Sequence, residues 1–435
     1  MRQRKNVVKL FMFFALVSLL SLSVVTAQDQ VTIKFWSHDY SPRKAIDDEI
    51  IAQFEKDNPN IKVDYTIGPG DDSQYVPQVL TALAGGEGPD LFNILTFLVP
   101  DLIPSGAVVP VDTVGMGYAS QQELIDSYLP GTLEGMLGED GKLYAVPTEL
   151  GNYALFINGD LFTAAGLDPV KDAPKTWEDL MTLAPKLTLK DADGNITQRA
   201  FDFSYPIPDE IVSGGITFNA MAYQLGGKLY NDDRTEATIN TDPWVKTYTF
   251  IRDYAKEFGG SSLTPSSIGF YEGNVAMVIS GPWYSDLVKS NNEAVANAIV
   301  TAPLPRWKDG LVNDTGSYLY SYGLFVNSQS SPEVQAAAWK LANALISQPE
   351  RYFKEALLLQ PRMSLVNNQE LMDSSFASMF IRDMENSPSL PALKNFGELP
   401  PIMDRALQRI LDEGADVQES LNTANDEFTA LLQEK

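Results

Sequence analysis

Cysteine is absent from this sequence of 435 residues, and histidine occurs once, at position 38. Without cysteine there are no disulfide bonds, so an exported form of the chain would have to rely on a large hydrophobic core. Zinc sites are built mainly from cysteine and histidine side chains. A single histidine therefore excludes a metal centre made of these two residue types, and we predict no cofactor and no metal site.

The histidine stands in the stretch VTIKFWSHDY, residues 31–40, between a serine and an aspartate. Ser37, His38 and Asp39 are neighbours, and neighbouring side chains project apart, so they cannot converge as a catalytic triad. The sequence also lacks the G-x-S-x-G, Walker A and strand-flanked G-x-G-x-x-G motifs. We predict no catalytic residues. A two-carboxylate glycosidase stays an alternative, because the chain holds 57 acidic residues.

Positive charge is also scarce. The 32 Lys and Arg residues face 57 Asp and Glu residues, which gives a net charge of -25. Such a surface repels nucleic acid and anionic membranes, so we expect no nucleic-acid partner. The length exceeds what one ordinary core holds, which predicts two domains.

Residues 1–27 differ from the rest of the chain. Four basic residues within the first nine precede the apolar run LFMFFALVSLLSLSVV, and Val25-Thr26-Ala27 places small residues where a cleavage site needs them. The apolar run is shorter than the roughly 20 residues that span a bilayer. The segment 1–27 therefore predicts a secretory signal peptide. No cysteine stands at the cleavage site, so we expect a periplasmic or other extracytoplasmic protein without a lipid anchor.

The mature sequence begins with an alternation of strands and helices. VTIKFW, IKVDYTI and DLFNIL are typical of buried strands, and the two segments between them have helical spacing of apolar residues. This β-α-β-α-β order predicts a parallel α/β sheet. Pro147 interrupts the extended run KLYAVPTELGNYALFIN, which does not fit one regular strand. Thr176 and Asp179 predict a capped helix that starts at TWEDLM.

Aromatic residues recur at predicted strand ends and in irregular segments. In an open α/β sheet, ligands bind beyond the carboxyl ends of the strands. Aromatic rings there can stack on the C–H faces of a sugar, while Asp, Asn and Arg side chains bond its hydroxyls. The aromatic residues concerned are Trp36, Tyr40, Tyr153, Tyr205, Trp283, Tyr284, Tyr318, Tyr320 and Tyr322.

A calcium loop is the other candidate site. Asp191, Asp193 and Asn195 occupy the first, third and fifth positions of a loop resembling an EF-hand, at residues 191–202. Gly194 falls at position four rather than six, and the twelfth residue is Asp202 rather than glutamate. Asp and Gly in this order favour a hairpin turn instead. We predict the turn, and a structural calcium ion stays open.

Several segments together resemble a known family, from about residue 31 to the C-terminus. IKFWSHD with IAQFEKDNPNIKVDY, GGEGPDLFNI, LYAVPTELGNYALFINGDLFTAAGLDPVKDAPKTWEDL and YEGNVAMVISGPW are similar to motifs of the extracellular solute-binding proteins of ATP-driven (ABC) importers. The match is to their large carbohydrate-binding cluster, which is maltose-binding-protein-like. Ile157 departs from the pattern, since family members often have tyrosine before the asparagine.

The resemblance implies an α/β protein of the two-lobe periplasmic-binding-protein fold (type II). Its discontinuous lobes are joined by hinge strands, and a ligand cleft lies between them. By similarity, the N-terminal lobe takes residues 28–148 and 320–372, and the C-terminal lobe takes 149–319 and 373–435. The implied function is hinge closure on a sugar, an oligosaccharide in our reading, and its delivery by a monomer to membrane permease subunits.

The resemblance also implies which residues touch the ligand. They follow the first strand, follow the Pro-Asp strand, lie on the two hinge strands, follow the Gly-Pro turn, or follow an interrupted helix. The predicted ligand-binding residues are Trp36, His38, Asp39, Asn93, Thr96, Glu149, Gly151, Tyr153, Trp283, Tyr284, Tyr318, Tyr320 and Arg362. Other solutes on the same scaffold stay open, namely a polyamine, a peptide or a phosphate ester.

Overall fold

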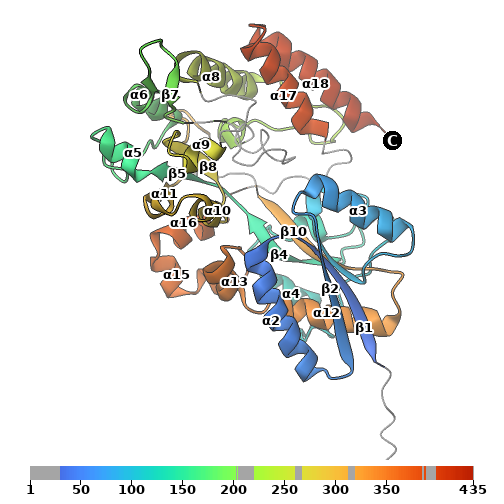
Figure 1. Ribbon diagram of the computed structural model, residues 1–435. Helices are drawn as coiled ribbons and strands as arrows, with labels where there is room; N and C mark the ends of the chain where they lie inside the picture. The colour runs from blue at the N-terminus through green and yellow to red at the C-terminus, as the bar shows by residue number, and fades with distance from the viewer. Residues whose placement is uncertain are drawn as a thin grey trace, which may run out of the picture.

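The computed structural model describes residues 30–201, 203, 220–259, 267–311, 319–384, 387 and 398–434. Figure 1 shows two regions, each with its own sheet and its own covering helices, joined by strands that run between them. The chain enters the first region, passes to the second, and returns to the first at β10 before its C-terminal helices. The predicted α/β class with two discontinuous lobes is therefore confirmed.

The first region is built on a five-stranded sheet. Strand β1 pairs in parallel with β2 and β3, and β10 runs antiparallel between β3 and β4. Every residue of β3 is buried, as a central strand covered on both faces should be. The strands, in sheet order, are β2 (Ile61–Gly68), β1 (Val31–His38), β3 (Leu91–Leu95), β10 (Tyr320–Val326) and β4 (Ala145–Gly151).

Helices cover this sheet and hold its apolar core. Phe35 stacks on Tyr65 with ring centroids 4.6 Å apart, and Phe92 stacks on Phe325 at 5.8 Å. Trp339 of α12 is 1% exposed in the same core. The helices are α2 (Ser41–Asp57), α3 (Asp72–Ala84), η1 (Thr96–Leu98), α4 (Gln121–Asp126), η2 (Glu134–Met136), α12 (Pro332–Leu345) and α13 (Pro349–Ala356).

The second region is built on a three-stranded antiparallel sheet, in the order β8-β5-β9. A separate two-stranded hairpin lies beside it. The strands are β5 (Ala154–Asn158), β8 (Met277–Ser280), β9 (Ile299–Ala302), β6 (Leu189–Lys190) and β7 (Ile196–Gln198). The helices are α5 (Gly159–Ala164), α6 (Trp177–Leu187), α8 (Asp242–Phe258), α9 (Ser267–Tyr271), α10 (Tyr284–Asn291), α11 (Glu293–Asn297), α17 (Leu399–Leu411) and α18 (Val417–Gln433).

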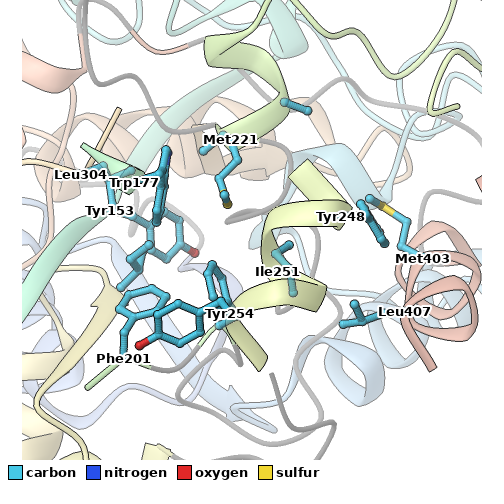
Figure 2. Packing of buried hydrophobic residues seen from close by; sticks show 14 of the residues in the cluster. Tyr153, Trp177, Phe201, Met221, Tyr248, Ile251, Tyr254, Leu304, Met403 and Leu407 are labelled. Atoms are coloured by element: carbon cyan, nitrogen blue, oxygen red, sulfur yellow. The ribbon is translucent and has the colours of Figure 1, made fainter. Parts of the chain in front are cut away.

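Aromatic side chains fill the core of the second region. Figure 2 shows Trp177, Phe201 and Tyr254 around this core, with Met403 and Leu407 of α17 closing it from the other side of α8. The indole N–H of Trp177 donates to Gln224 Oε1 at 2.9 Å, so the buried ring has no unsatisfied donor. Helix α6 begins with the predicted capping box, in which Thr176 and Asp179 bond each other's backbone N–H groups.

Three more helices form a layer against the second sheet. They are α14 (Met363–Val366), α15 (Gln369–Asp373) and α16 (Ser375–Asp383). Phe380 of α16 packs against Phe156 of β5 at 6.3 Å between ring centroids. The amide of Asn152, just before β5, donates to the Phe380 carbonyl at 2.6 Å. The chain thus passes from α13 to this layer through residues 357–362.

Pro147 lies inside β4, and the structure explains how the strand accommodates it. The pairing of β4 with β10 shifts register between Tyr322 and Gly323, which leaves Thr148 as an extra residue. The extended run ends at Gly151, and β5 begins at Ala154 in the other sheet. The prediction that this run is not one regular strand is confirmed.

The loop after Asp191 forms the predicted hairpin turn between β6 and β7. Asp191 Oδ1 accepts from the backbone N–H groups of Asp193 and Asn195, at 3.0 and 2.8 Å. Gly194 has φ of +88°, a conformation that suits glycine. Asp202 lies outside the described residues. Within those residues, no group of three or more acidic or histidine side chains is placed to hold a metal ion.

Candidate functional site

The end of β1 meets β4, the first strand that leads toward the second sheet, in a buried charged cluster. Arg43, in the first turn of α2, places Nη1 3.4 Å from Glu149 Oε2 and 3.2 Å from His38 Nε2. Its Nη2 donates to the His38 carbonyl oxygen. His38 Nε2 lies 3.6 Å from Glu149 Oε1. The side chains of Arg43 and Glu149 are 4% and 8% exposed, so neither is a surface charge.

Asp47 is the second carboxylate that pairs with Arg43. Its Oδ2 lies 3.8 Å from Arg43 Nε, one turn back along the same helix. Asp47 also accepts hydrogen bonds from Tyr65 of β2 at 2.7 Å and from Tyr352 of α13 at 2.5 Å. A buried guanidinium needs this kind of pairing, because an unpaired buried charge is costly. The cluster therefore has one cation fixed between two carboxylates.

Burial shifts the pKa values in this cluster. Burial raises the pKa of Glu149 to about 7, against the opposing pull of the Arg43 guanidinium. Burial likewise raises the pKa of Asp72 to about 6, although a hydrogen bond from Tyr322 opposes the shift. Burial, helped by Arg43, lowers the pKa of His38 well below its usual value. The imidazole is therefore neutral at neutral pH and serves as a hydrogen-bonding group.

Four aromatic rings form a row from the end of β1 to the start of β5. The His38 ring stacks on Tyr322 at 4.2 Å, Tyr322 lies 6.2 Å from Tyr320, and Tyr320 lies 6.1 Å from Tyr153. Tyr320 is half-buried and the other three are buried. This aromatic row, His38-Tyr322-Tyr320-Tyr153, follows the junction of the two sheets and includes three of the predicted ligand-binding residues.

Gly151 makes room for the middle of the aromatic row. It pairs with Tyr320 across β4 and β10, and a Cβ on Gly151 would lie 2.1 Å from Tyr320 Cζ. Real Cβ atoms do not approach a ring so closely. Glycine at this position therefore leaves room for the Tyr320 ring to approach the hinge strand closely.

Replacing Gly151 with alanine is expected to displace the Tyr320 ring and lower the free energy of unfolding by about 1–3 kcal/mol, the usual cost of overpacking. Thermal and urea unfolding, with near-UV circular dichroism for the tyrosine environment, measure both effects. Gly135→Ala is the control, because a Cβ there has its nearest neighbour at 3.9 Å. Equal losses in the two variants would contradict the close approach.

The second region contributes Trp283 and Tyr284, and the two differ sharply. Trp283 follows Gly281 and Pro282 and is half-buried, whereas Tyr284 is fully buried. The Tyr284 ring packs edge-on against Phe156 at 5.6 Å, inside the core. The half-buried Trp283 ring is the member of this pair with surface left to offer a ligand. Tyr284 instead anchors the turn that carries it.

Asn93, in the middle of β3, and Thr96, just after that strand, are engaged within the sheet. Asn93 accepts from Thr148 Oγ1 at 2.9 Å and donates to Ser37 Oγ at 3.4 Å. The Thr96 hydroxyl donates to the Ser321 carbonyl at 2.9 Å. Both predicted residues thus tie β3 to the hinge strands β4 and β10.

The remaining predicted residues are more scattered. Trp36 is half-buried against the first core, and Asp39 is exposed just beyond β1. Arg362 lies beside Tyr118 and Tyr128: it donates to Tyr118 at 2.8 Å, and its guanidinium lies 4.4 Å from the Tyr128 ring centroid. Tyr318, like Tyr205, lies outside the described residues. The structure therefore groups His38, Glu149, Gly151, Tyr153 and Tyr320 at the junction of the sheets and places Arg362 apart from them.

Sequence reasoning missed Arg43 and Asp47. The spacing of Arg43 and Asp47, four apart in the first turns of α2, was a signal for an ion pair. Nothing in that spacing showed that the pair would be buried, or that Glu149, 106 residues away, would join it. Asp72 follows β2, which lies next to β1, so strand order places it near the end of β1.

Known proteins resemble this chain in sequence and in structure. The sequence matches the family described as "Bacterial extracellular solute-binding protein" over residues 39–351. It is 24% identical over 390 residues to the galactooligosaccharide-binding protein of Bacillus subtilis, covering 86% of this chain and 84% of the relative. It is also 24% identical over 428 residues to an sn-glycerol-3-phosphate-binding periplasmic protein of Escherichia coli, covering 94% of each.

Solved structures share the architecture. An ABC transporter solute-binding protein of Thermotoga lettingae, bound to α-D-tagatose, superposes with a TM-score of 0.77 at 21% identity. The match covers 93% of this chain and 100% of the other. At that identity the likeness establishes the fold. None of the helices in the described ranges is long and apolar enough to cross a membrane.

Proposed function

This chain belongs to the family of bacterial extracellular solute-binding proteins, and we propose that it binds a sugar of oligosaccharide size between its lobes. In this proposal the lobes take residues 28–148 with 320–356, and 149–319 with 363–435. The boundary expected at residue 372 moves back to the passage at 357–362, because Leu365 and Leu371 share a core with Phe156 of β5. They close on the sugar by bending at the strands that join them, and the closed form delivers it to the permease subunits of an ABC importer. Closure shifts with ligand because the closed form binds the sugar more tightly.

The aromatic row at the junction of the sheets carries the proposal. Tyr320 is half-buried within this row, and Trp283 is half-buried at the start of α10. Rings of this kind offer flat apolar faces to the C–H faces of a pyranose, while neighbouring carboxylates accept from its hydroxyls. Asp72, which accepts from Tyr322, and Glu149, beside His38, are carboxylates of the first region next to that row, and Asp39 is exposed just beyond β1.

The charges of the buried cluster at His38, Arg43 and Glu149 argue for a neutral ligand. A phosphate ester, the solute named for the Escherichia coli relative, would need cations free to face it. Arg43 is buried and already lies within 4 Å of both Glu149 and Asp47. The sugar named for the Bacillus subtilis relative places no such demand. We therefore favour a neutral oligosaccharide.

The proposal includes export and the absence of catalysis. Residues 1–27 act as a signal peptide in it, and the mature protein is a monomer without lipid anchor in the extracytoplasmic space. The solute-binding family supports this location. No group in the cluster is placed to act on a glycosidic bond in this proposal, because the described carboxylates of the cluster are held by Arg43 and tyrosines.

Native mass spectrometry of the protein as purified from its own host tests the proposal directly. A mass addition equal to a hexose or pentose oligomer is expected. Titration with maltotriose, raffinose, an arabinotriose and a galactotriose, followed by tryptophan fluorescence, should then identify the class. Binding of glycerol-3-phosphate with no response to any sugar would overturn the sugar proposal. Release of smaller sugars from the bound oligomer would overturn the absence of catalysis.

Replacing Asp39 with alanine is expected to weaken sugar binding by about tenfold, the loss of one or two hydrogen bonds to a charged acceptor. Folding should be unchanged, because Asp39 is exposed and its side chain supports no buried group. Calorimetric titration measures the affinity, and thermal unfolding checks the fold. Asp64→Ala, on β2, is a control. Unchanged affinity in Asp39→Ala would remove this loop from the site.

A further inference from the structure

All three passages between the sheets adjoin one buried charged cluster. Glu149 stands two residues before the end of β4, and Tyr322 stands two residues after the start of β10. Tyr352 lies in α13, the last helix before the passage at 357–362. The cluster therefore contacts a side chain in the first two passages and one in the helix that leads into the third.

Arg43 joins these side chains to the end of β1. It lies 3.4 Å from Glu149 Oε2, and it contacts both the ring and the carbonyl oxygen of His38, whose ring stacks on Tyr322. Its Nε lies 3.8 Å from Asp47, which accepts from Tyr352 at 2.5 Å. The Arg43 guanidinium thus contacts the side chain at the first passage directly. It is linked to Tyr322 at the second passage through His38, and to Tyr352 near the third through Asp47.

The geometry of the group fits this task. A planar guanidinium can address several acceptors in fixed directions at once, whereas a lysine ammonium is a single point charge. Arg43 is 3% exposed, so it cannot serve as a surface contact for a ligand. The adjacent residue on the same helix, Lys44, is exposed and pairs with Asp48 at 2.5 Å. Arg43 and Lys44 therefore differ in burial and in the carboxylates that they pair with.

We propose that Arg43 is the positioning residue of the cleft: it holds the His38 and Glu149 wall in register with the three crossings, so that lobe closure brings that wall onto the sugar. Arg43 does not touch the ligand. It acts through Glu149, His38 and Asp47. The inference rests on the proposed function, because the wall that it positions is the proposed sugar wall.

The test measures the distance between the lobes separately from ligand affinity. The chain has no cysteine, so Lys56→Cys on α2 and Lys186→Cys on α6, both exposed, would accept two spin labels and no others. Pulsed dipolar spectroscopy then gives the inter-lobe distance distribution with no ligand and with the best-binding sugar of the panel. The variants in this background are Arg43→Met, Arg43→Lys, Glu149→Gln and the Arg43→Met/Glu149→Gln pair, with Lys44→Met as matched control.

We expect Arg43→Met to broaden the unliganded distribution and to weaken sugar binding about tenfold or more. Arg43→Lys keeps the positive charge but not the planar guanidinium with its several donors, so an intermediate loss of affinity of about threefold is expected. Lys44→Met should bind the sugar as the parent does. The Arg43→Met/Glu149→Gln pair should lose less affinity than the sum of the two single changes, because both remove the contact between Arg43 and Glu149.

Three results would overturn the inference. They are parental distances and affinity in Arg43→Met, parental behaviour in Arg43→Lys, and additive losses in the double variant. If Arg43→Met does not fold, Arg43→Lys decides the question by the same two readouts. If the parent binds no sugar, the proposed function fails, and the unliganded distance distributions still decide whether Arg43 positions the lobes.

Discussion

Replacing Trp283 with alanine is expected to weaken sugar binding by about 10- to 100-fold, roughly 1.4–2.8 kcal/mol. Trp283 is half-buried at the start of α10 and lies edge-on to Tyr284, with ring centroids 6.0 Å apart. Its uncovered surface can still be buried against a sugar at about 25 cal/mol per Å². Stacking contributes about 0.5–1.5 kcal/mol beyond that area. Calorimetric titration measures the loss without relying on the indole as reporter.

Two further variants make the Trp283 test specific. Trp283→Phe keeps a flat ring and should retain most of the affinity. Tyr144→Ala removes a half-buried ring that bonds Asp140, just before β4 and at the opposite end of that strand from Gly151, and should leave binding unchanged. Parental affinity in Trp283→Ala, or an equal loss in Tyr144→Ala, would show that Trp283 is not a stacking residue.

Local patterns in the sequence predicted much of the fold. The alternation of β1, α2, β2, α3 and β3 follows from apolar spacing within each segment, which depends on near neighbours alone. The cap of α6 is likewise a contact between Thr176 and Asp179, three residues apart. The lobe architecture came from the motif resemblance, and the family match and the sheets bear it out.

The site was harder to predict because its contacts span long sequence distances. Glu149 could have been an exposed hinge carboxylate, yet it is buried because α2 brings Arg43 against it across 106 residues. Asn93 was expected to follow its strand, but it is the middle residue of β3, and its side-chain oxygen accepts a hydrogen bond from Thr148 of β4. Tyr284 follows a half-buried tryptophan in sequence, and helical rotation turns it into the core. Each outcome depends on which elements pack against one another in the fold. The spacing of residues within one segment does not encode that.

Replacing Glu149 with glutamine is expected to change how stability depends on pH. The pKa of Glu149 is about 7 in the folded chain, above its ordinary value of 4.5. Between these values the folded chain holds a proton that the unfolded chain has released, so the wild-type protein loses stability as pH rises through 7. Glutamine does not titrate. The unfolding free energy of the variant relative to wild type should therefore rise by about 3 kcal/mol between pH 4.5 and pH 8.

The other charged groups around Glu149 do not account for this difference. The lowered pKa of His38 changes stability with pH in the opposite direction, since the stability that the neutral imidazole contributes is lost as pH falls through 6.5. His38, Arg43, Asp47 and Asp72 are present in both proteins, so their own titrations occur in both profiles. Urea unfolding at half-unit steps of pH measures the two profiles, and Glu87→Gln, at an exposed carboxylate, should track wild type. Parallel profiles for Glu149→Gln and wild type would mean that Glu149 carries its full charge in the folded protein. Its place beside Arg43 would then be that of a permanent ion pair rather than a titrating wall of the cleft.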